Sequence, residues 1–311
     1  MKQVLILLFL MIVITGCSDG DQESGTKTDP FIGGVKGIDV NFAEGSPPKE
    51  VYDGGSNPFE VSVTLKNKGE YTVTSDNVLV TLSGILPSEF GVSESDLKKH
   101  PEEDLLATEK NAEGGTIEGP QVYVTFDNLN RQEQLDGNKE YPIRADVCYL
   151  YQTTAVADIC LRENNLDTTK EGVCNVNEPK VTYNSGAPVH ITDFKEYPRA
   201  TNKVGFTFKV THVGSGEIFR KDSECSKEQE VDENKVWLEL TSEFESGLKC
   251  SGLSEGDDTS GYVRLYDRSH QVSCTQEVST QSDYQTPIRI KAIYDYEEEQ
   301  TANVLVKHAV S

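Results

Sequence analysis

The chain has 311 residues, with 52 acidic and 29 basic side chains and a formal net charge of −23 at pH 7. A surface of this charge repels nucleic acid and anionic lipid at close range, so the composition argues against nucleic-acid binding. The length is that of about two domains.

The first segment has the build of a secretory signal. Residues 1–17 hold one basic residue, an apolar run from Val4 to Ile14, and Gly16 directly before Cys17. The run is too short to span a bilayer, which takes about 20 residues, and its small-residue end is typical of a signal peptide. It resembles the signal of bacterial and archaeal lipoproteins, which implies that Cys17 is lipidated and becomes the first mature residue. The alternative is an uncleaved anchor in which Cys17 has no role. Both interpretations place the protein outside the cytoplasm, anchored to the cell membrane.

The residues that follow are polar. Residues 18–30 contain no aromatic or β-branched cluster that could bury enough surface to fold. We expect residues 18–33 to form a flexible stalk that lifts the folded part off the membrane.

The rest of the chain alternates between apolar and polar residues in short runs bounded by turn residues, which is typical of β-strands. In the first half the expected strands are Gly37–Phe42, Phe59–Asn67, Thr72–Thr74, Asn77–Ser83, Gln121–Asp127, Pro142–Tyr151 and Ala155–Leu161. In the second half they are Val189–Glu196, Lys203–His212, Glu217–Arg220, Lys235–Thr241, Gly261–Tyr266, Val272–Glu277, Pro287–Tyr296 and Thr301–Lys307. One stretch, residues 93–110, begins like a helix, but Pro101 interrupts it, so we expect only short turns there.

The second half repeats the first at an offset of 145 residues. The strand at residues 59–69 maps onto residues 204–214, including the closing glycine, and residues 142–151 map onto residues 287–296. In the latter pair, Pro-Ile-Arg and two tyrosines match. Two strand motifs that share one offset indicate an internal duplication.

We therefore expect two copies of one domain, at residues 34–166 and 186–311, joined by a linker at residues 167–185. About seven short strands per copy predict a two-sheet sandwich, and the half-polar alternation predicts antiparallel sheets with one solvated face.

Three segments carry a family resemblance: the strand of V-x-V-x-L-K-N-K-G type at residues 61–69, the returning strand of R-A-D-V-C-Y type at residues 144–149, and the hairpin expected after it. They resemble CARDB-type and related immunoglobulin-like domains of bacterial and archaeal surface proteins. The resemblance implies an all-β chain of two tandem immunoglobulin-like antiparallel β-sandwiches. It implies a structural and adhesive role and no catalytic residues.

Six cysteines follow Cys17, and no two of them form a CxxC motif, so neither a thioredoxin-like motif nor a zinc knuckle is supported. An even number of cysteines in an exported chain indicates disulfides. If the chain turns at Thr154, Cys148 lies across from Cys160 on the outer side of a hairpin, within reach of a cross-strand disulfide.

The other cysteines are paired by their positions relative to the strands. Cys250 and Cys274 follow or end strands of the second copy, so we pair them with each other. Cys174 in the linker is then left to bond Cys225 in an insertion. A bond between Cys160 and Cys174 is the alternative.

No sequence motif indicates catalysis or metal binding. Residues 213–216 carry a valine where a nucleophile elbow needs glycine, and read as a turn. The five histidines lack the H-E-x-x-H spacing. Three acidic stretches lack the spacing of a calcium loop: residues 297–299, at an expected hairpin tip, residues 255–258 and residues 102–104. We interpret them as solvated loop tips, and the alternative is that they bind a metal. We predict no catalytic residue, no metal site and no cofactor.

The single tryptophan, Trp237, takes the strand phase opposite to Leu238. It therefore faces outward or packs under the insertion that carries Cys225. Local packing is the favoured interpretation, and stacking on a sugar beside Tyr262 and Tyr266 is the alternative.

The sequence favours a non-catalytic, lipid-anchored cell-surface protein that acts as an adhesive, scaffolding or accessory envelope subunit. Its expected partner is a protein or glycan of the cell envelope, and self-association is compatible with this role. Residues 84–120 and 221–234 are the largest insertions and the expected contact segments. The alternative is a ligand-binding lipoprotein that takes a glycan or a metal and serves a transporter or an envelope enzyme.

Overall fold

A computed structural model describes residues 29–167, 172–228, 230–278 and 282–309. Within these ranges the protein is all-β, and residues Phe31–Ser311 form one compact unit. The expected signal peptide with Cys17, and most of the expected stalk, lie outside the described residues. No helix in the described part of the chain is long and apolar enough to cross a membrane.

The strands follow the expected pattern over most of the chain. They are β1 (Ile38–Phe42), β2 (Glu50–Tyr52), β3 (Phe59–Asn67), β4 (Val78–Ser83), β5 (Lys98–Lys99), β6 (Glu109–Lys110), β7 (Thr116–Ile117), β8 (Gln121–Leu129), β9 (Lys139–Leu161), β10 (Thr182–Asn184), β11 (Val189–Ala200), β12 (Lys203–His212), β13 (Glu217–Phe219), β14 (Lys235–Thr241), β15 (Leu248–Ser251), β16 (Ser260–Arg264), β17 (Ser269–Glu277) and β18 (Tyr284–Lys307). Four 3₁₀ turns accompany them: η1 (Ser75–Asn77), η2 (Pro87–Phe90), η3 (Ser95–Leu97) and η4 (Glu230–Asp232). The expected strand Thr72–Thr74 is reduced to an isolated bridge between Val73 and Leu105.

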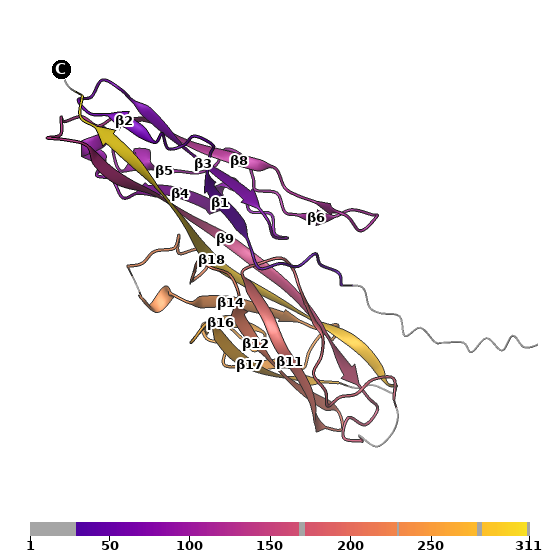
Figure 1. Ribbon diagram of the computed structural model, residues 1–311. Coiled ribbons are helices and arrows are strands. Elements are labelled where there is room, and N and C mark those ends of the chain that lie inside the picture. The colour runs from indigo at the N-terminus through magenta and orange to yellow at the C-terminus, as the bar shows by residue number, and fades with distance from the viewer. Residues whose placement is uncertain (1–28, 168–171, 229, 279–281, 310–311) are drawn as a thin grey trace, which may run out of the picture. The chain divides into compact units, whose positions relative to one another are not determined.

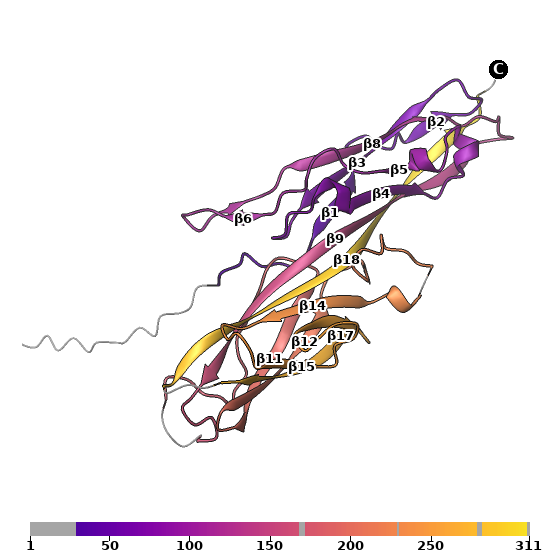
Figure 2. The ribbon, with the colours of Figure 1, turned by 180° about the vertical axis from the view of Figure 1, so that it is seen from behind.

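Two expected hairpins are wrong, because each is one long strand. β9 and β18 run straight through the expected turns and pair with each other in antiparallel register, from Leu161 opposite Tyr284 to Lys139 opposite Val306. Residues 151–155 contain no glycine, proline, asparagine or aspartate that would favour a tight turn, so the backbone stays extended. Figures 1 and 2 show the two strands as a twisted ribbon that runs the length of an elongated body.

This ribbon is the centre of a nine-stranded sheet, and two smaller sheets pack on it. The large sheet has the main order β16-β14-β18-β9-β4-β5. One small sheet is β1-β3-β8 and the other is β11-β12-β17-β15. Both contact the same face of the ribbon, since β1 and β3 hydrogen-bond to Tyr149 and Tyr151, while β12 hydrogen-bonds to Tyr296. We call this the tyrosine face, and the opposite one the outer face.

The two repeats are interleaved. Lobe 1, built on β1–β8, contains the first half of β9 and the second half of β18. Lobe 2, built on β10–β17, contains the second half of β9 and the first half of β18. Each lobe therefore receives one strand segment from the other repeat, in the place where the hairpin was expected (Figure 1).

A local twofold relation organises the midpoint of the ribbon. Leu150 pairs directly with Asp295, its own equivalent in the 145-residue repeat. On the tyrosine face four buried tyrosines surround this point: Tyr149, Tyr151, Tyr294 and Tyr296. The ring centroids of Tyr149 and Tyr296 lie 5.8 Å apart in an edge-to-face arrangement, which aromatic pairs favour.

The surrounding contacts are duplicated too. The Tyr151 hydroxyl donates to Asn67 Oδ1 at 3.1 Å, and the Tyr296 hydroxyl bonds His212 Nε2 at 3.0 Å. Asn67 and His212 are 145 residues apart. A Cβ atom on Gly69 or on its equivalent, Gly214, would overlap the nearby tyrosine hydroxyl. The glycine that closes the repeated strand is therefore needed for packing against the ribbon.

The structure contains three disulfides, and one of them has the expected pairing. Cys250 bonds Cys274 between the neighbouring strands β15 and β17, as predicted. The predicted pairs Cys148–Cys160 and Cys174–Cys225 are wrong.

The two errors have one cause, since the hairpin that would oppose Cys148 to Cys160 does not form. Cys148 instead bonds Cys225, and Cys160 bonds Cys174, which was the alternative. Cys148–Cys225 joins the first repeat to the second.

Candidate functional site

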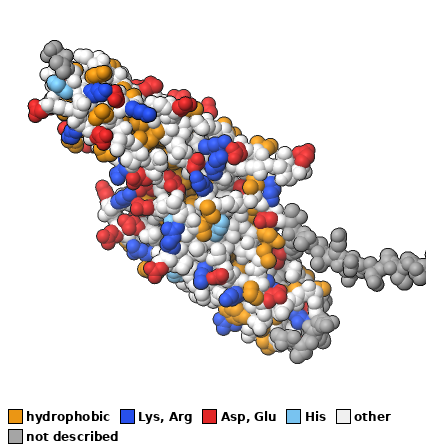
Figure 3. Space-filling model, viewed as in Figure 1, with side chains coloured by type: hydrophobic (Ala, Val, Ile, Leu, Met, Phe, Trp, Pro, Cys, Tyr) orange, Lys and Arg blue, Asp and Glu red, His pale blue; other side chains and the backbone are white. Residues whose placement is uncertain are grey.

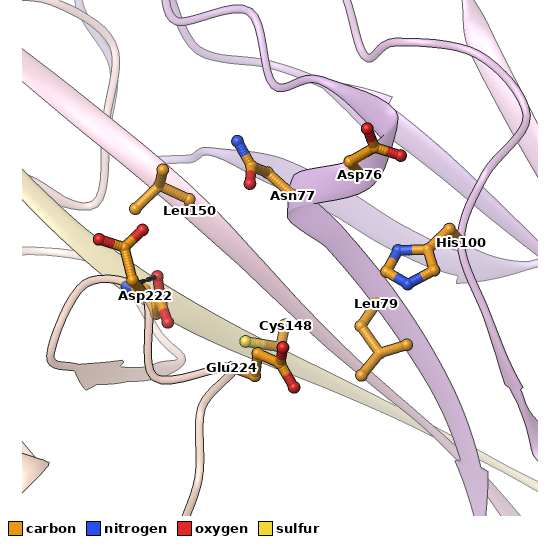
Figure 4. A pocket seen from close by; sticks show the side chains of 9 residues that line it. Asp76, Asn77, Leu79, His100, Cys148, Leu150, Asp222 and Glu224 are labelled. Carbon is orange, nitrogen blue, oxygen red and sulfur yellow. Dashed lines mark hydrogen bonds between the residues drawn. The ribbon is translucent and has the colours of Figure 1, made fainter.

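A cleft of about 220 Å³ opens on the outer face at the midpoint of the ribbon. Its lining comprises Asp76, Asn77, Leu79, His100, Cys148, Leu150, Asp222, Glu224 and Asp295. Figure 4 shows that Asp76, Asn77 and His100 approach from lobe 1, while Asp222 and Glu224 approach from the opposite side.

The floor of the cleft is set by the twofold centre of the fold. Strand alternation sends the central tyrosines to one face of the ribbon and the paired residues Leu150 and Asp295 to the other. Turn η1 then places Asp76 and Asn77 directly before β4, which flanks β9. The cleft thus lies where the two repeats meet, and each repeat supplies part of its wall.

The expected contact segment at residues 221–234 forms one wall. Asp295, which is 3% exposed, accepts hydrogen bonds from the backbone amides of Asp222 and Ser223 at 3.1 and 2.7 Å. Burial raises the pKa of the Asp295 carboxyl, and these amide donors act against the rise. Cys225 anchors the same segment to β9 through its disulfide to Cys148.

This wall has a constrained backbone. Asp222, Glu224 and Cys225 all have left-handed φ values, of 62°, 52° and 52°. Such conformations are costly for residues other than glycine and persist when the surroundings fix them. Here the Cys225 disulfide and the hydrogen bonds to Asp295 hold the segment in place.

The cleft is acidic. Four carboxyl groups line it, at Asp76, Asp222, Glu224 and Asp295, and the lining contains neither lysine nor arginine. His100, from the other expected contact segment at residues 84–120, donates through Nδ1 to the Val78 carbonyl oxygen at 2.6 Å. The cleft is therefore suited to a cationic or hydrogen-bonding group and disfavours an anion.

A shallower hollow of about 430 Å³ continues from the cleft along the outer face. It shares Leu79, Cys148 and Glu224 with the cleft and extends to Asp146 and Glu228. Across the side of the molecule seen in Figure 3, acidic and basic side chains are interspersed.

The N-terminal segment of the described chain lies on the tyrosine face, opposite the cleft. The Glu70 carboxylate accepts hydrogen bonds from the amides of Ile32, Gly33 and Gly186 at 2.7–2.9 Å. Gly34 accepts one from the amide of Ala187. Ile32 and Gly33, at the end of the expected stalk, are thus bonded to lobe 1, and Gly34 directly after them is bonded to lobe 2.

The other residues singled out in the sequence lie away from the cleft. Trp237 packs edge-on against Tyr262, with ring centroids 4.8 Å apart, and Lys221 lies over its ring. The favoured interpretation of local packing is therefore confirmed. Residues 213–216 form the expected turn after β12.

The acidic stretches differ from one another in their surroundings. Residues 297–299 lie within β18 and not at a hairpin tip, so that expectation is wrong. Glu255 is paired with Arg220 and Lys235, and Asp104 accepts the Ser75 amide. Within the described ranges no group of three or more histidine, cysteine, aspartate or glutamate side chains could hold a metal ion.

Sequence reasoning missed five residues of the cleft, namely Asp76, Asn77, Leu79, Leu150 and Asp295. The repeat carried part of the signal for the last two, because antiparallel pairing of equivalent strands brings one pair of equivalent residues together on the twofold axis. The register that makes Leu150 and Asp295 this pair comes from the fold. No protein-family model matches the chain, and a search of curated proteins finds no match either.

Proposed function

We propose that this is a non-catalytic, lipid-anchored cell-surface protein that acts as an adhesive, scaffolding or accessory envelope subunit. Its two lobes would be immunoglobulin-like sandwiches of the CARDB type, anchored through Cys17. The three disulfides support an oxidising environment outside the cytoplasm.

One observation carries the proposal: the N-terminal segment and the cleft lie on opposite faces of the ribbon. The Glu70 carboxylate fixes Ile32 and Gly33 on the tyrosine face. Leu150 and Asp295 form the floor of the cleft on the outer face. A tether attached ahead of Ile32 would therefore join the folded part on the face opposite the cleft and leave the cleft open to a partner.

The construction of the cleft favours a contact surface over a passive spacer. Both of the largest insertions contribute to its walls: residues 84–120 supply His100 beside turn η1, and residues 221–234 form the opposite wall, which a disulfide fixes. The partner that fits is an envelope protein or glycan with a cationic or hydrogen-bonding group.

The test is a crosslinking pull-down with the chain from Ser18 onward, mixed with envelope from its own source. Asp76→Lys with Glu224→Lys reverses the charge of the cleft and should abolish capture of the dominant partner. Glu133→Lys with Asp136→Lys makes the same charge change at exposed positions outside the cleft and outside both contact segments, and should leave capture intact. Equal capture by both double variants would contradict a role for the cleft.

A second proposal is a ligand-binding lipoprotein that serves a transporter or an envelope enzyme. The size of the cleft and its asparagine, histidine and carboxyl groups favour a small polar ligand such as a glycan. In that case the pull-down recovers no protein, and the soluble chain is retained on envelope glycan or, for a bound cation, on a metal resin. The Asp76→Lys and Glu224→Lys double variant should not be retained.

A further inference from the structure

The two halves of this chain recognise each other through a surface that is nearly self-complementary. Strands β9 and β18 pair over their full lengths, and the pairing is centred on the equivalent residues Leu150 and Asp295. Each repeat contributes to this ribbon the same strand, with two matching tyrosines at its midpoint.

The contacts that close each lobe come from both repeats. In lobe 1, β9 pairs with β4 on one side and with the end of β18 on the other. In lobe 2, β18 pairs with β14 on one side and with the end of β9 on the other. A repeat without its counterpart would leave one edge of its long strand unpaired and half of that strand without a lobe.

Nothing in these contacts requires both repeats to belong to one chain. Apart from the Cys148–Cys225 disulfide, the covalent link between the repeats is the segment at residues 162–188. This segment includes β10. Because the Cys160–Cys174 disulfide holds residue 174 beside β9, the part that can span is residues 175–188, which when extended could reach roughly 45 Å.

We propose that the ribbon is also an interaction surface for a second copy of this chain. The first repeat of one copy pairs with the second repeat of the other, which gives an exchanged dimer whose lobes keep their internal contacts. This inference does not depend on the lipid anchor or on the cleft.

The amount of dimer should follow the protein concentration during folding. In the unfolded chain, a connection of this length presents the second repeat to the first at an effective concentration on the order of 1 mM. Pairing between chains should therefore account for about a thousandth of the product at 1 µM and about a tenth at 100 µM.

The disulfides report which chain supplied each repeat. Cys148–Cys225 joins the two repeats, so it becomes a bond between chains in the exchanged dimer. Cys160–Cys174 joins the first repeat to the start of the linker that follows it and serves as the internal control, because it stays within one chain in either form.

The experiment mixes equal amounts of unlabelled and ¹⁵N-labelled full-length chain. The mixture is unfolded in urea with reductant, refolded at 1 and at 100 µM, reoxidised and analysed by peptide mass spectrometry. Cys148–Cys225 peptides that combine the two labels should increase about a hundredfold between the two concentrations. Cys160–Cys174 peptides should carry a single label at both.

The Cys148→Ser and Cys225→Ser double variant is the matched control, because it leaves neither thiol of this bridge free. It should still give a dimer in size-exclusion chromatography at 100 µM, but no covalent dimer on a non-reducing gel. If the unfolded chain does not refold, the labelled chains are instead mixed folded, in reductant and urea below the unfolding transition, and then reoxidised. Absence of mixed-label Cys148–Cys225 peptides at 100 µM, in protein with the original circular dichroism spectrum, overturns the proposal by either route.

Discussion

Removal of the Cys148–Cys225 disulfide should destabilise the protein more than removal of Cys160–Cys174. The two bridges have sequence separations of 77 and 14 residues. In the chain-entropy model a bridge restricts the unfolded chain in proportion to the logarithm of the loop that it closes. The model gives about 4.5 kcal/mol for the longer loop and about 3 kcal/mol for the shorter one.

The assay is urea unfolding of two double variants, Cys148→Ser with Cys225→Ser and Cys160→Ser with Cys174→Ser. The free energy of unfolding should fall about 1.5 kcal/mol further in the first. The slope of the free energy against urea shows whether the unfolded states are comparable. If the first variant loses no more stability than the second at equal slopes, the argument from loop length is refuted.

The same variant should also loosen the wall of the cleft. Cys225 and the hydrogen bonds to Asp295 hold residues 221–234 in place. Without the disulfide, amide hydrogen exchange in that segment should accelerate while exchange in β3 stays unchanged. Unchanged exchange at residues 221–234 would show that Asp295 suffices to order them.

Three further predictions concern the tyrosine face, the N-terminal segment and a buried carboxyl group. Tyr296→Phe removes the hydrogen-bond partner of His212 Nε2 and of the Gly216 amide, so it should lower the free energy of unfolding by about 2 kcal/mol in thermal or urea unfolding. Tyr151→Phe should lower it by about 1 kcal/mol. Equal losses would contradict the hydrogen-bond assignment. Glu70→Ala removes the carboxylate that accepts hydrogen bonds from three backbone amides, so limited proteolysis should cut the N-terminal segment faster than in the wild type. An unchanged rate of cleavage would contradict the role of Glu70 as an anchor. Burial raises the pKa of Glu196 from 4.5 to about 7 despite its ion pair with Lys180, so the folded state binds the proton more tightly than the unfolded state. The contribution of Glu196 to stability should therefore fall by about 3 kcal/mol as the pH rises from 4.5 to 7. Glu196→Gln does not titrate, so the difference in free energy of unfolding between wild type and variant, measured in urea at both pH values, should change by this amount. A difference that is the same at both pH values would contradict the raised pKa.

The sequence predicts the individual strands well where local pattern decides them. The bounds of β3, β12 and β14 are those expected, because each alternates strictly and is closed by turn residues or glycine. Trp237 takes the expected phase for the same reason.

The pairing of the long strands could not be decided locally. Alternation continues unbroken from Lys139 to Leu161, and a strand that folds back on itself and one that pairs with a distant copy have the same pattern. The missing turn residues near Thr154 were the one local indication. Because the disulfide assignment depended on that turn, Cys148 was matched to the wrong partner.

The cleft was predictable only in part. The two insertions were identified by their length, and both contribute to its walls. The roles of Leu150 and Asp295 depend on which faces of β9 and β18 meet solvent, and that follows from tertiary pairing. Asp295 is also buried under the 221–234 segment, which no local pattern indicates.

The unbroken register of the ribbon restricts how the two repeats can change over generations. A one-residue insertion within β9 would turn every following side chain to the opposite face, sending polar groups such as Asp158 into the core of lobe 2. Only a matching change in β18 could restore the pairing. Length variation is therefore confined to loops, where the copies have diverged, as at residues 221–234. The ribbon is inherited as a matched pair of strands, and this keeps residues 142–151 and 287–296 in one register.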